Sequence, residues 1–437
     1  MNNSAKSYLF RKNISLSFFK FLERKKIDYS YLGNTFNFPQ KIKTDVDMYV
    51  DFKNIDDLKM ILSKFTKRKN LEVINFIQHE FSHINVIVCN INKKDDEYLS
   101  LDICNEFVHL SRKLINFKQV QKKIFNKKEF NFKILDSKHE FLYYFLKKII
   151  KKDIEKSSFL YLKKKFRSLK NYESQIFFSL NDFILLQKIF KTNKIFHFKF
   201  YNHYFKNKLI DKKRKNFLKE IFRYFIRNKY KTGFHIVFLG CDGSGKSSQI
   251  NSLINSKLNI NVFRNYSVYH LYNKQFSKKN SPQLPYQKTS YNLTLSFVKI
   301  LFLYFKFLFN YFFELYPRIR SSHLIISDRY YQDVIIDPKR YRIGHLKSFL
   351  NLIFKLLPKP DLIIILDSTV GNLIKRQNEI NEKQIKDLVL KFKNYQKKCN
   401  YCIIVKSNNT IEKINRKIIK LIKYQKLLLY KKSLDKG

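Results

Sequence analysis

The chain has 437 residues, more than a single hydrophobic core usually serves, so we expect two or three domains. Its cysteines are odd in number, five spread from Cys89 to Cys402, which argues against a disulfide framework and indicates a reducing compartment. The formal net charge of +52 is mostly lysine and accompanies many isoleucine, asparagine, phenylalanine and tyrosine residues, so compositional drift explains much of it; without an aromatic-interleaved recognition motif, we expect no dedicated nucleic-acid role.

The N-terminal third contains short strands that carry acidic side chains. The first residues lack an apolar export signal, so we expect a cytoplasmic protein. A helix over 18–25 precedes a strand over 29–32. The strand over 43–51 alternates and places Asp45 and Asp47 on one side, and the strand over 98–103 carries Asp102. Three such carboxylates can hold Mg²⁺ for attack on a nucleotide α-phosphate. Alternatively, Asp45 and Asp47 are solvent-facing acids on an edge strand.

This acidic pattern resembles the nucleotidyltransferase superfamily. In that family a Gly-Ser turn precedes a strand bearing D-x-D, and a later strand brings a third acid. Gly33 would take the turn glycine, with Asn34 where the family usually has serine, and Asp45, Asp47 and Asp102 would take the acidic positions. The resemblance implies an α+β nucleotidyltransferase-like domain over 1–134 with a second Mg²⁺ site.

The middle of the chain is expected to be helical. No glycine or proline interrupts residues 135–230, and apolar residues recur there at helical spacing. We predict helices over 141–152, 159–168, 177–191 and 212–230. The segment therefore reads as a helical connector whose lysines form a solvated face.

The strongest motif follows a buried strand over 234–239. The chain runs from this strand through G-x-x-x-x-G-K-S, Gly240 to Ser247, into a helix, which is the context of a P-loop. Such a loop wraps backbone N–H groups around a polyphosphate, with Lys246 on the β- and γ-phosphates and Ser247 on Mg²⁺. The predicted ATP-binding residues are Gly240, Gly243, Ser244, Gly245, Lys246, Ser247 and Ser248.

Further strands in this part alternate with helices. We expect strands over 259–263, ending at Arg264, and over 322–327, 362–367 and 402–405. The pattern predicts an α/β fold with a doubly wound parallel sheet over 231–437 and a ligand crevice at the carboxyl ends of its strands. The apolar stretch over 293–316 is interrupted by charges, and we expect a long buried helix there, with peripheral membrane contact left open.

The motifs in this part resemble thymidylate kinases. Gly240 to Gln249 is similar to that family's P-loop, Asp328-Arg329-Tyr330 to its D-R-Y motif, and Pro360 to Asp367 to its P-D-L-x-x-x-L-D strand. A thymidylate-kinase-like branch associated with surface-glycan biosynthesis is more similar still. It carries D-R-Y-Y-x-D, D-P-x-R-Y-R and R-K-Q-E, matched here by 328–333, 337–342 and, in part, 375–379.

The resemblance implies a role for each matching residue. Asp328 would join Ser247 at the Mg²⁺ ion, Arg329 and Arg264 would grip an acceptor phosphate, and Asp242 would bind an acceptor hydroxyl. Arg376 would neutralise charge on the transferred group. The substrate-binding set is Asp242, Arg264, Arg329, Tyr330, Arg340 and Arg342, and the catalytic set is Lys246, Asp328, Arg329 and Arg376.

These patterns together predict an ATP- and Mg²⁺-dependent phosphotransferase. Residues 331–338 replace the small polar stretch that contacts thymine in thymidylate kinases, so the acceptor is a nucleoside monophosphate or another small phosphate- or hydroxyl-bearing metabolite. The N-terminal domain would add nucleotidyl transfer. The alternative is an ATP-binding regulatory module that engages polyanions or membranes without turning over a metabolite. A homodimer also stays open.

Overall fold

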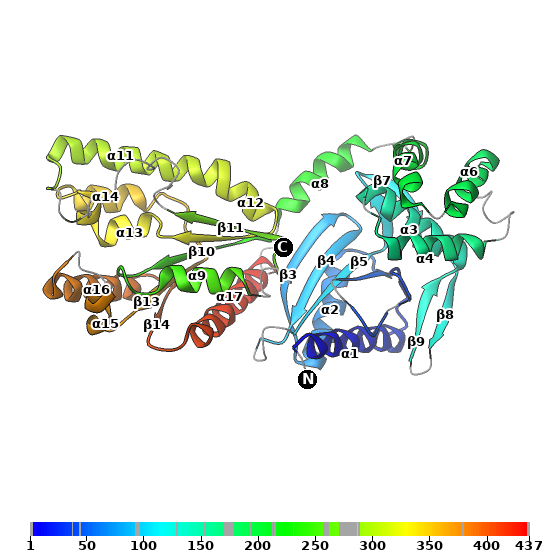
Figure 1. The fold of residues 1–437 in the computed structure, drawn as a ribbon, viewed down its shortest axis with the longest axis horizontal. Helices are drawn as coiled ribbons and strands as arrows, with labels where there is room; N and C mark the ends of the chain where they lie inside the picture. The colour runs from blue at the N-terminus through cyan, green and yellow to red at the C-terminus, as the bar shows by residue number, and fades with distance from the viewer. Residues whose placement is uncertain are drawn as a thin grey trace. The chain divides into compact units, whose positions relative to one another are not determined.

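The computed structural model divides the chain into two compact units, Met1–Tyr230 and Lys231–Gly437 (Figure 1). It describes residues 3–36, 38–42, 45–91, 97–127, 130–152, 154–169, 179–192, 194–211, 213, 216–229, 231–256, 262–270, 286, 289–376 and 380–434. Residues 259–261 of one predicted strand and 377–379 of one predicted motif lie outside these ranges.

The first unit contains a mixed seven-stranded sheet in the order β3-β4-β5-β2-β1-β9-β8. β2 and β5 run parallel, with Asp47 opposite Asp102, so the two predicted acidic strands are neighbours. The strands are β1 (Tyr29–Tyr31), β2 (Asp45–Val50), β3 (Glu72–Glu80), β4 (His83–Cys89), β5 (Tyr98–Cys104), β8 (Lys122–Lys127) and β9 (Phe130–Leu135). A separate hairpin pairs β6 (Glu106–His109) with β7 (Arg112–Asn116).

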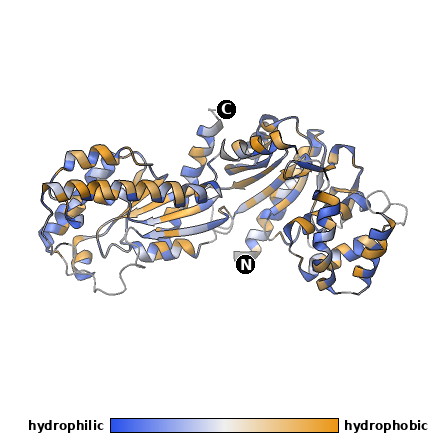
Figure 2. Ribbon diagram, turned by 90° about the horizontal axis from the view of Figure 1, so that it is seen from above, coloured by the Kyte–Doolittle hydropathy of each residue, from blue (hydrophilic) through white to orange (hydrophobic). Residues whose placement is uncertain are grey.

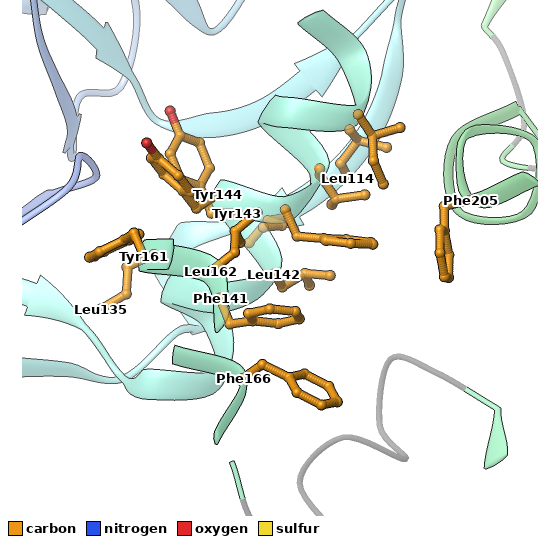
Figure 3. Packing of buried hydrophobic residues seen from close by; sticks show 14 of the residues in the cluster. Leu114, Leu135, Phe141, Leu142, Tyr143, Tyr144, Tyr161, Leu162, Phe166 and Phe205 are labelled. Atoms are coloured by element: carbon orange, nitrogen blue, oxygen red, sulfur yellow. The ribbon is translucent and has the colours of Figure 1, made fainter. Parts of the chain in front are cut away.

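The helices of the first unit share one hydrophobic core with the sheet. Phe141 and Leu142 from α3, Leu135 of β9 and Tyr161 of α4 belong to a single cluster of buried residues (Figure 3). The segment expected to be a separate connector therefore belongs to the first unit. Its helices are α3 (Ser137–Lys151), α4 (Lys156–Arg167), α6 (Leu180–Lys191), α7 (Ile195–Lys206) and α8 (Phe217–Lys229), with a π-helical turn at Asn207–Asp211; α1 (Asn3–Arg24), α2 (Ile55–Lys69) and a 3₁₀ turn at Phe117–Gln119 precede them.

The second unit is built on a five-stranded parallel sheet in the order β11-β12-β10-β13-β14. The strands are β10 (Phe234–Leu239), β11 (Asn265–His270), β12 (His323–Asp328), β13 (Leu362–Asp367) and β14 (Cys402–Lys406). The central strand β10 is buried along its whole length. The parallel sheet predicted for this part is confirmed, and its strand order reverses at β10, where parallel sheets bind ligands.

Helices lie on both faces of this sheet (Figure 1). They are α9 (Lys246–Ile254), α11 (Leu293–Asn310), α12 (Tyr316–Arg320), α13 (Tyr331–Ile336), α14 (Lys347–Phe354), α15 (Val370–Arg376), α16 (Glu382–Lys397) and α17 (Ile411–Leu434), with a π-helical turn at Tyr311–Leu315 and a 3₁₀ turn at Pro338–Tyr341. Cys399, which follows α16, and Cys402, the first residue of β14, form a disulfide that the sequence analysis did not predict.

The long apolar helix differs from its prediction. We expected a buried helix, but only 22% of the most apolar window of Leu293–Arg320 is buried. By length and composition this helix could cross a membrane. Ile300, Leu303 and Phe307 pack into the core of the second unit, whereas Phe309 and Phe313 are 57% and 75% exposed. The prediction of a buried helix is therefore wrong for one side of it, because composition cannot tell which apolar faces find a partner.

Candidate active site around the P-loop

The loop between β10 and α9 has the backbone shape that a phosphate cradle requires. Gly240, Gly243 and Gly245 have φ angles of 139°, 78° and 93°, which side-chain-bearing residues rarely adopt. At Gly240 an added Cβ would also lie 2.7 Å from the Leu366 carbonyl oxygen. The loop leads directly into α9, whose first residues are Lys246, Ser247 and Ser248. The N–H groups at this helix end favour an anion.

Lys246 is buried inside the loop and holds it in shape. Its Nζ donates to the carbonyl oxygens of Gly240 and Cys241, both at 2.9 Å, and lies 3.7 Å from Asp242 Oδ1. Burial, together with the positive charge of Arg329, lowers the pKa of Lys246 to about 8. An incoming polyphosphate would offset this cost of burying a cation.

Two arginines converge on the P-loop acid. Arg329 Nη2 and Arg340 Nη1 each donate to one carboxylate oxygen of Asp242. Burial alone would raise the pKa of Asp242, but the charges of Arg329, Lys246 and Arg340 hold it well below its usual range. Asp242, expected to meet an acceptor hydroxyl, is thus engaged by two predicted substrate-binding arginines.

A fully buried carboxylate, that of Asp333, also binds the guanidinium of Arg329. Arg329 Nη1 donates to both Asp333 carboxylate oxygens at 2.8 Å, and the Tyr341 hydroxyl donates to Asp333 Oδ2 at 2.6 Å. Asp333 is 0% exposed, and Arg329 has a φ of 66°, a strained conformation for a residue other than glycine. Sequence analysis gave Asp333 no role; its i,i+4 spacing from Arg329 was the available signal.

The predicted metal ligand Asp328 ends β12. Its Oδ2 lies 3.3 Å from His270 Nδ1 at the end of β11, and its buried Oδ1 has no hydrogen-bond partner among the described residues. The same holds for Ser244 Oγ in the loop. These two buried oxygens, one at the end of β12 and one in the loop, fit a cation or its water, as Mg²⁺ bound with a nucleotide would supply. Sequence analysis missed His270.

Arg376 and Arg342 take different places. Arg376 Nη1 donates to the Gly243 carbonyl oxygen at 3.2 Å, which brings this arginine of α15 onto the P-loop. Arg342 instead donates to the Thr289 carbonyl oxygen and the Tyr291 hydroxyl and lies over the Tyr291 ring. Its side chain therefore secures the segment before α11, and its contacts within the described residues do not include Asp242.

Two predicted substrate-binding residues lie away from the loop. The described strand β11 covers 265–270, so Arg264 stands just before its amino end, where its N–H donates to the Ser322 carbonyl oxygen. The P-loop follows the carboxyl end of β10, so it lies at the opposite end of these parallel strands. Tyr330 is 3% exposed, with its ring between Phe307 and His235 in the core. These contacts join Arg264 and Tyr330 to other parts of the unit, and their role in substrate binding stays a prediction.

In the first unit, the three predicted acids come together. Asp45, Asp47 and Asp102 offer oxygens that all lie within 4.8 Å of one another. Lys147 of α3 lies 2.5 Å from Asp47, and His83 Nε2 lies 2.8 Å from Asp102. Burial opposes the charge of Lys147, but the carboxylates of Asp47, Asp102 and Asp45 outweigh it and raise the pKa of Lys147. Sequence analysis missed both basic partners.

The geometry defines the second unit as a parallel α/β unit with a P-loop at its switch point. No protein-family model matches the chain, and no curated protein matches it. Among solved structures it is similar to a thymidylate kinase from Candida albicans, at 20% identity over 45% of this chain and 93% of that one, with a TM-score of 0.33. A thymidylate kinase from Ehrlichia chaffeensis matches at 18% identity over 44% of this chain and 98% of that one, also with a TM-score of 0.33.

Proposed function

We propose that the second unit is an ATP- and Mg²⁺-dependent phosphotransferase of the thymidylate-kinase-like group. The observation that carries the proposal is the loop itself: three glycines with positive φ, a buried lysine and a helix N-terminus at the switch point of a parallel sheet. Arg329, Arg340 and Arg376 all contact this loop. Such a concentration of fixed cations suits a polyphosphate and the charge that spreads over a transferring phosphoryl group.

The residues divide the chemistry between them. The loop amides and Lys246 would bind the ATP phosphates, and Ser247 and Asp328 would hold Mg²⁺, which neutralises phosphate charge when bound. An ionised phosphate oxygen of the acceptor, or a hydroxyl oxygen that loses its proton to water, forms a bond to the γ-phosphorus. The bond from that phosphorus to the bridging oxygen breaks, and ADP leaves. Arg376 would stabilise the transferring group, while Arg329 and Arg340, held by Asp242, would orient the acceptor.

The acceptor is a nucleoside monophosphate or another small metabolite with a phosphate or hydroxyl group. Labelled ATP offered with a panel of nucleoside monophosphates, sugars and polyols tests this, with transfer of label to one acceptor as the expected result. Steeply salt-dependent polyanion binding without transfer would instead favour the regulatory alternative and refute the kinase.

A second proposal concerns the acids of the first unit. We infer that Asp45, Asp47 and Asp102 bind a divalent cation in a nucleotidyltransferase-like domain. Asp47 Oδ1 is buried and has no hydrogen-bond partner among the described residues. A buried oxygen that binds a cation is expected to lack such a partner when the cation is absent. Lys147 neutralises Asp47 in the absence of that cation.

Replacing Asp47 by alanine should weaken Mn²⁺ binding to the nucleotide-free chain by about tenfold or more, because a carboxylate ligand is lost. Titration followed by Mn²⁺ electron paramagnetic resonance measures this. Asp56→Ala, which removes an exposed acid of α2, is the control. Equal Mn²⁺ affinity in the Asp47 variant and the wild type would refute the site. Nucleotidyl transfer at this site would be supported if the chain released pyrophosphate from a nucleoside triphosphate and the Asp45→Ala variant did not.

A further inference from the structure

The solvent side of α11, of the π-helical turn after it and of the first residue of α12 carries an apolar row. The row recurs every three or four residues, so it follows one side of the helix. Its members are Leu295, Val298, Phe302, Phe305, Phe309, Phe312, Phe313 and Tyr316, all exposed. We call this row the outward face of α11. Figure 2 shows hydrophobic residues along much of this helix. A face this long and apolar marks a binding surface.

The opposite side of the helix is already used. Ile300, Leu303 and Phe307 pack into the core of the second unit, and Phe307 lies 5.3 Å from the Tyr330 ring. The helix is therefore fixed to its unit along one side, which excludes burial of its whole circumference in lipid. A surface contact, with the outward face alone buried, satisfies both sides.

Neighbouring rings along the outward face lie against one another. Phe305 and Phe309 have ring centroids 6.3 Å apart, and Phe309 and Phe313 have theirs 6.1 Å apart. The neighbouring α14 is joined to α11 by stacking of Phe349 on Phe297 at 5.1 Å. This helix and the turn after it add Leu352 and Leu356, which are 65% and 71% exposed.

Charge decides what covers this face. Helices α11 and α12 with the turn between them contain four basic residues, Lys299, Lys306, Arg318 and Arg320, against the single acid Glu314. Residues 338–360, which include α14, contain no acid. A second copy would bring the same +52 charge and be repelled, whereas anionic headgroups attract each nearby lysine or arginine.

We propose that the outward face of α11, together with Leu352 and Leu356, docks on a bilayer surface that contains anionic lipid. The phenylalanine rings enter the boundary between headgroups and acyl chains, and the flanking lysines and arginines reach the lipid phosphates. The proposal rests on this surface and not on the proposed phosphotransferase.

Flotation of the full chain with vesicles tests the docking. We expect it to float with vesicles of phosphatidylcholine and phosphatidylserine and less with phosphatidylcholine alone. The double variant Phe305→Asp/Phe309→Asp should reduce the bound fraction by about tenfold or more, since two inserted rings are replaced by charges. Phe196→Asp/Phe200→Asp on α7 is the matched control, because those rings are also exposed and four residues apart. It should float like the wild type.

A fluorescent reporter gives an independent measurement. The chain contains no tryptophan, so Phe309→Trp and Phe200→Trp each create a single one. We expect a blue shift on addition of the anionic vesicles for Phe309→Trp only. Equal flotation of the Phe305/Phe309 variant and the wild type would overturn the proposal. The proposal would also be overturned if the wild type bound no vesicles but formed a dimer that the Phe305/Phe309 variant could not form. A second copy would then cover the outward face of α11.

Discussion

Replacing Lys246 by alanine is expected to reduce phosphoryl transfer from ATP by about a thousandfold or more, because a fixed cation at the transferring phosphates is lost. The fold should survive. Burying a charged amine is costly, and removing it offsets the loss of its hydrogen bonds to Gly240 and Cys241. Label transfer from ATP, measured beside a thermal unfolding curve, separates the two effects.

The matched control for this variant is Lys386→Ala. Lys386 lies on α16 of the same unit in an exposed pair with Glu382, so its removal tests general loss of a positive charge. The control should transfer phosphate at the wild-type rate. Transfer by the Lys246 variant within a factor of a few of wild type, with folding intact, would contradict the placement of ATP on this loop.

Local features of both units were predictable from sequence, because each motif is encoded within a few residues. The strand over 234–239 and the glycines that follow it specify the loop without help from distant residues. Asp45 and Asp47 were placed on one side of a strand by alternation alone. Their approach to Asp102 needed the pairing of β2 with β5, which the structure supplies.

Predictions that depended on tertiary placement were less secure. Arg264 was predicted at the carboxyl end of a strand, but β11 begins one residue after it. Arg264 therefore lies at the amino end of that strand, away from the carboxyl ends where the P-loop lies. Tyr330 follows Arg329 directly, yet the start of α13 turns its ring into the core. Lys147 was missed because its pairing with Asp47 depends on the packing of α3 against β2. Asp333 was missed although its partner Arg329 lies only four residues before it.

The second large effect concerns Asp333. Asp333→Ala should destabilise the second unit by about 3 kcal/mol, because it leaves the guanidinium of Arg329 buried with one of its two carboxylate partners gone. Hydrogen exchange of the β10 and β12 amides reports stability within that unit. Asp387→Ala provides the matched control: Asp387 also pairs with a cation four residues away, Lys391, but at the surface. Its loss should cost less than about 0.5 kcal/mol.

A double variant distinguishes support of the site from support of the fold. Arg329→Met/Asp333→Leu replaces the buried pair with apolar side chains, which often match or exceed such a pair in stability. We therefore expect the exchange protection lost in Asp333→Ala to return in the double variant, while phosphoryl transfer stays low because Arg329 is absent. Unchanged protection in Asp333→Ala would show that Asp242 alone is sufficient to compensate the buried charge of Arg329. Transfer restored by the double variant would instead remove Arg329 from the acceptor site and leave Arg340 as the arginine held by Asp242.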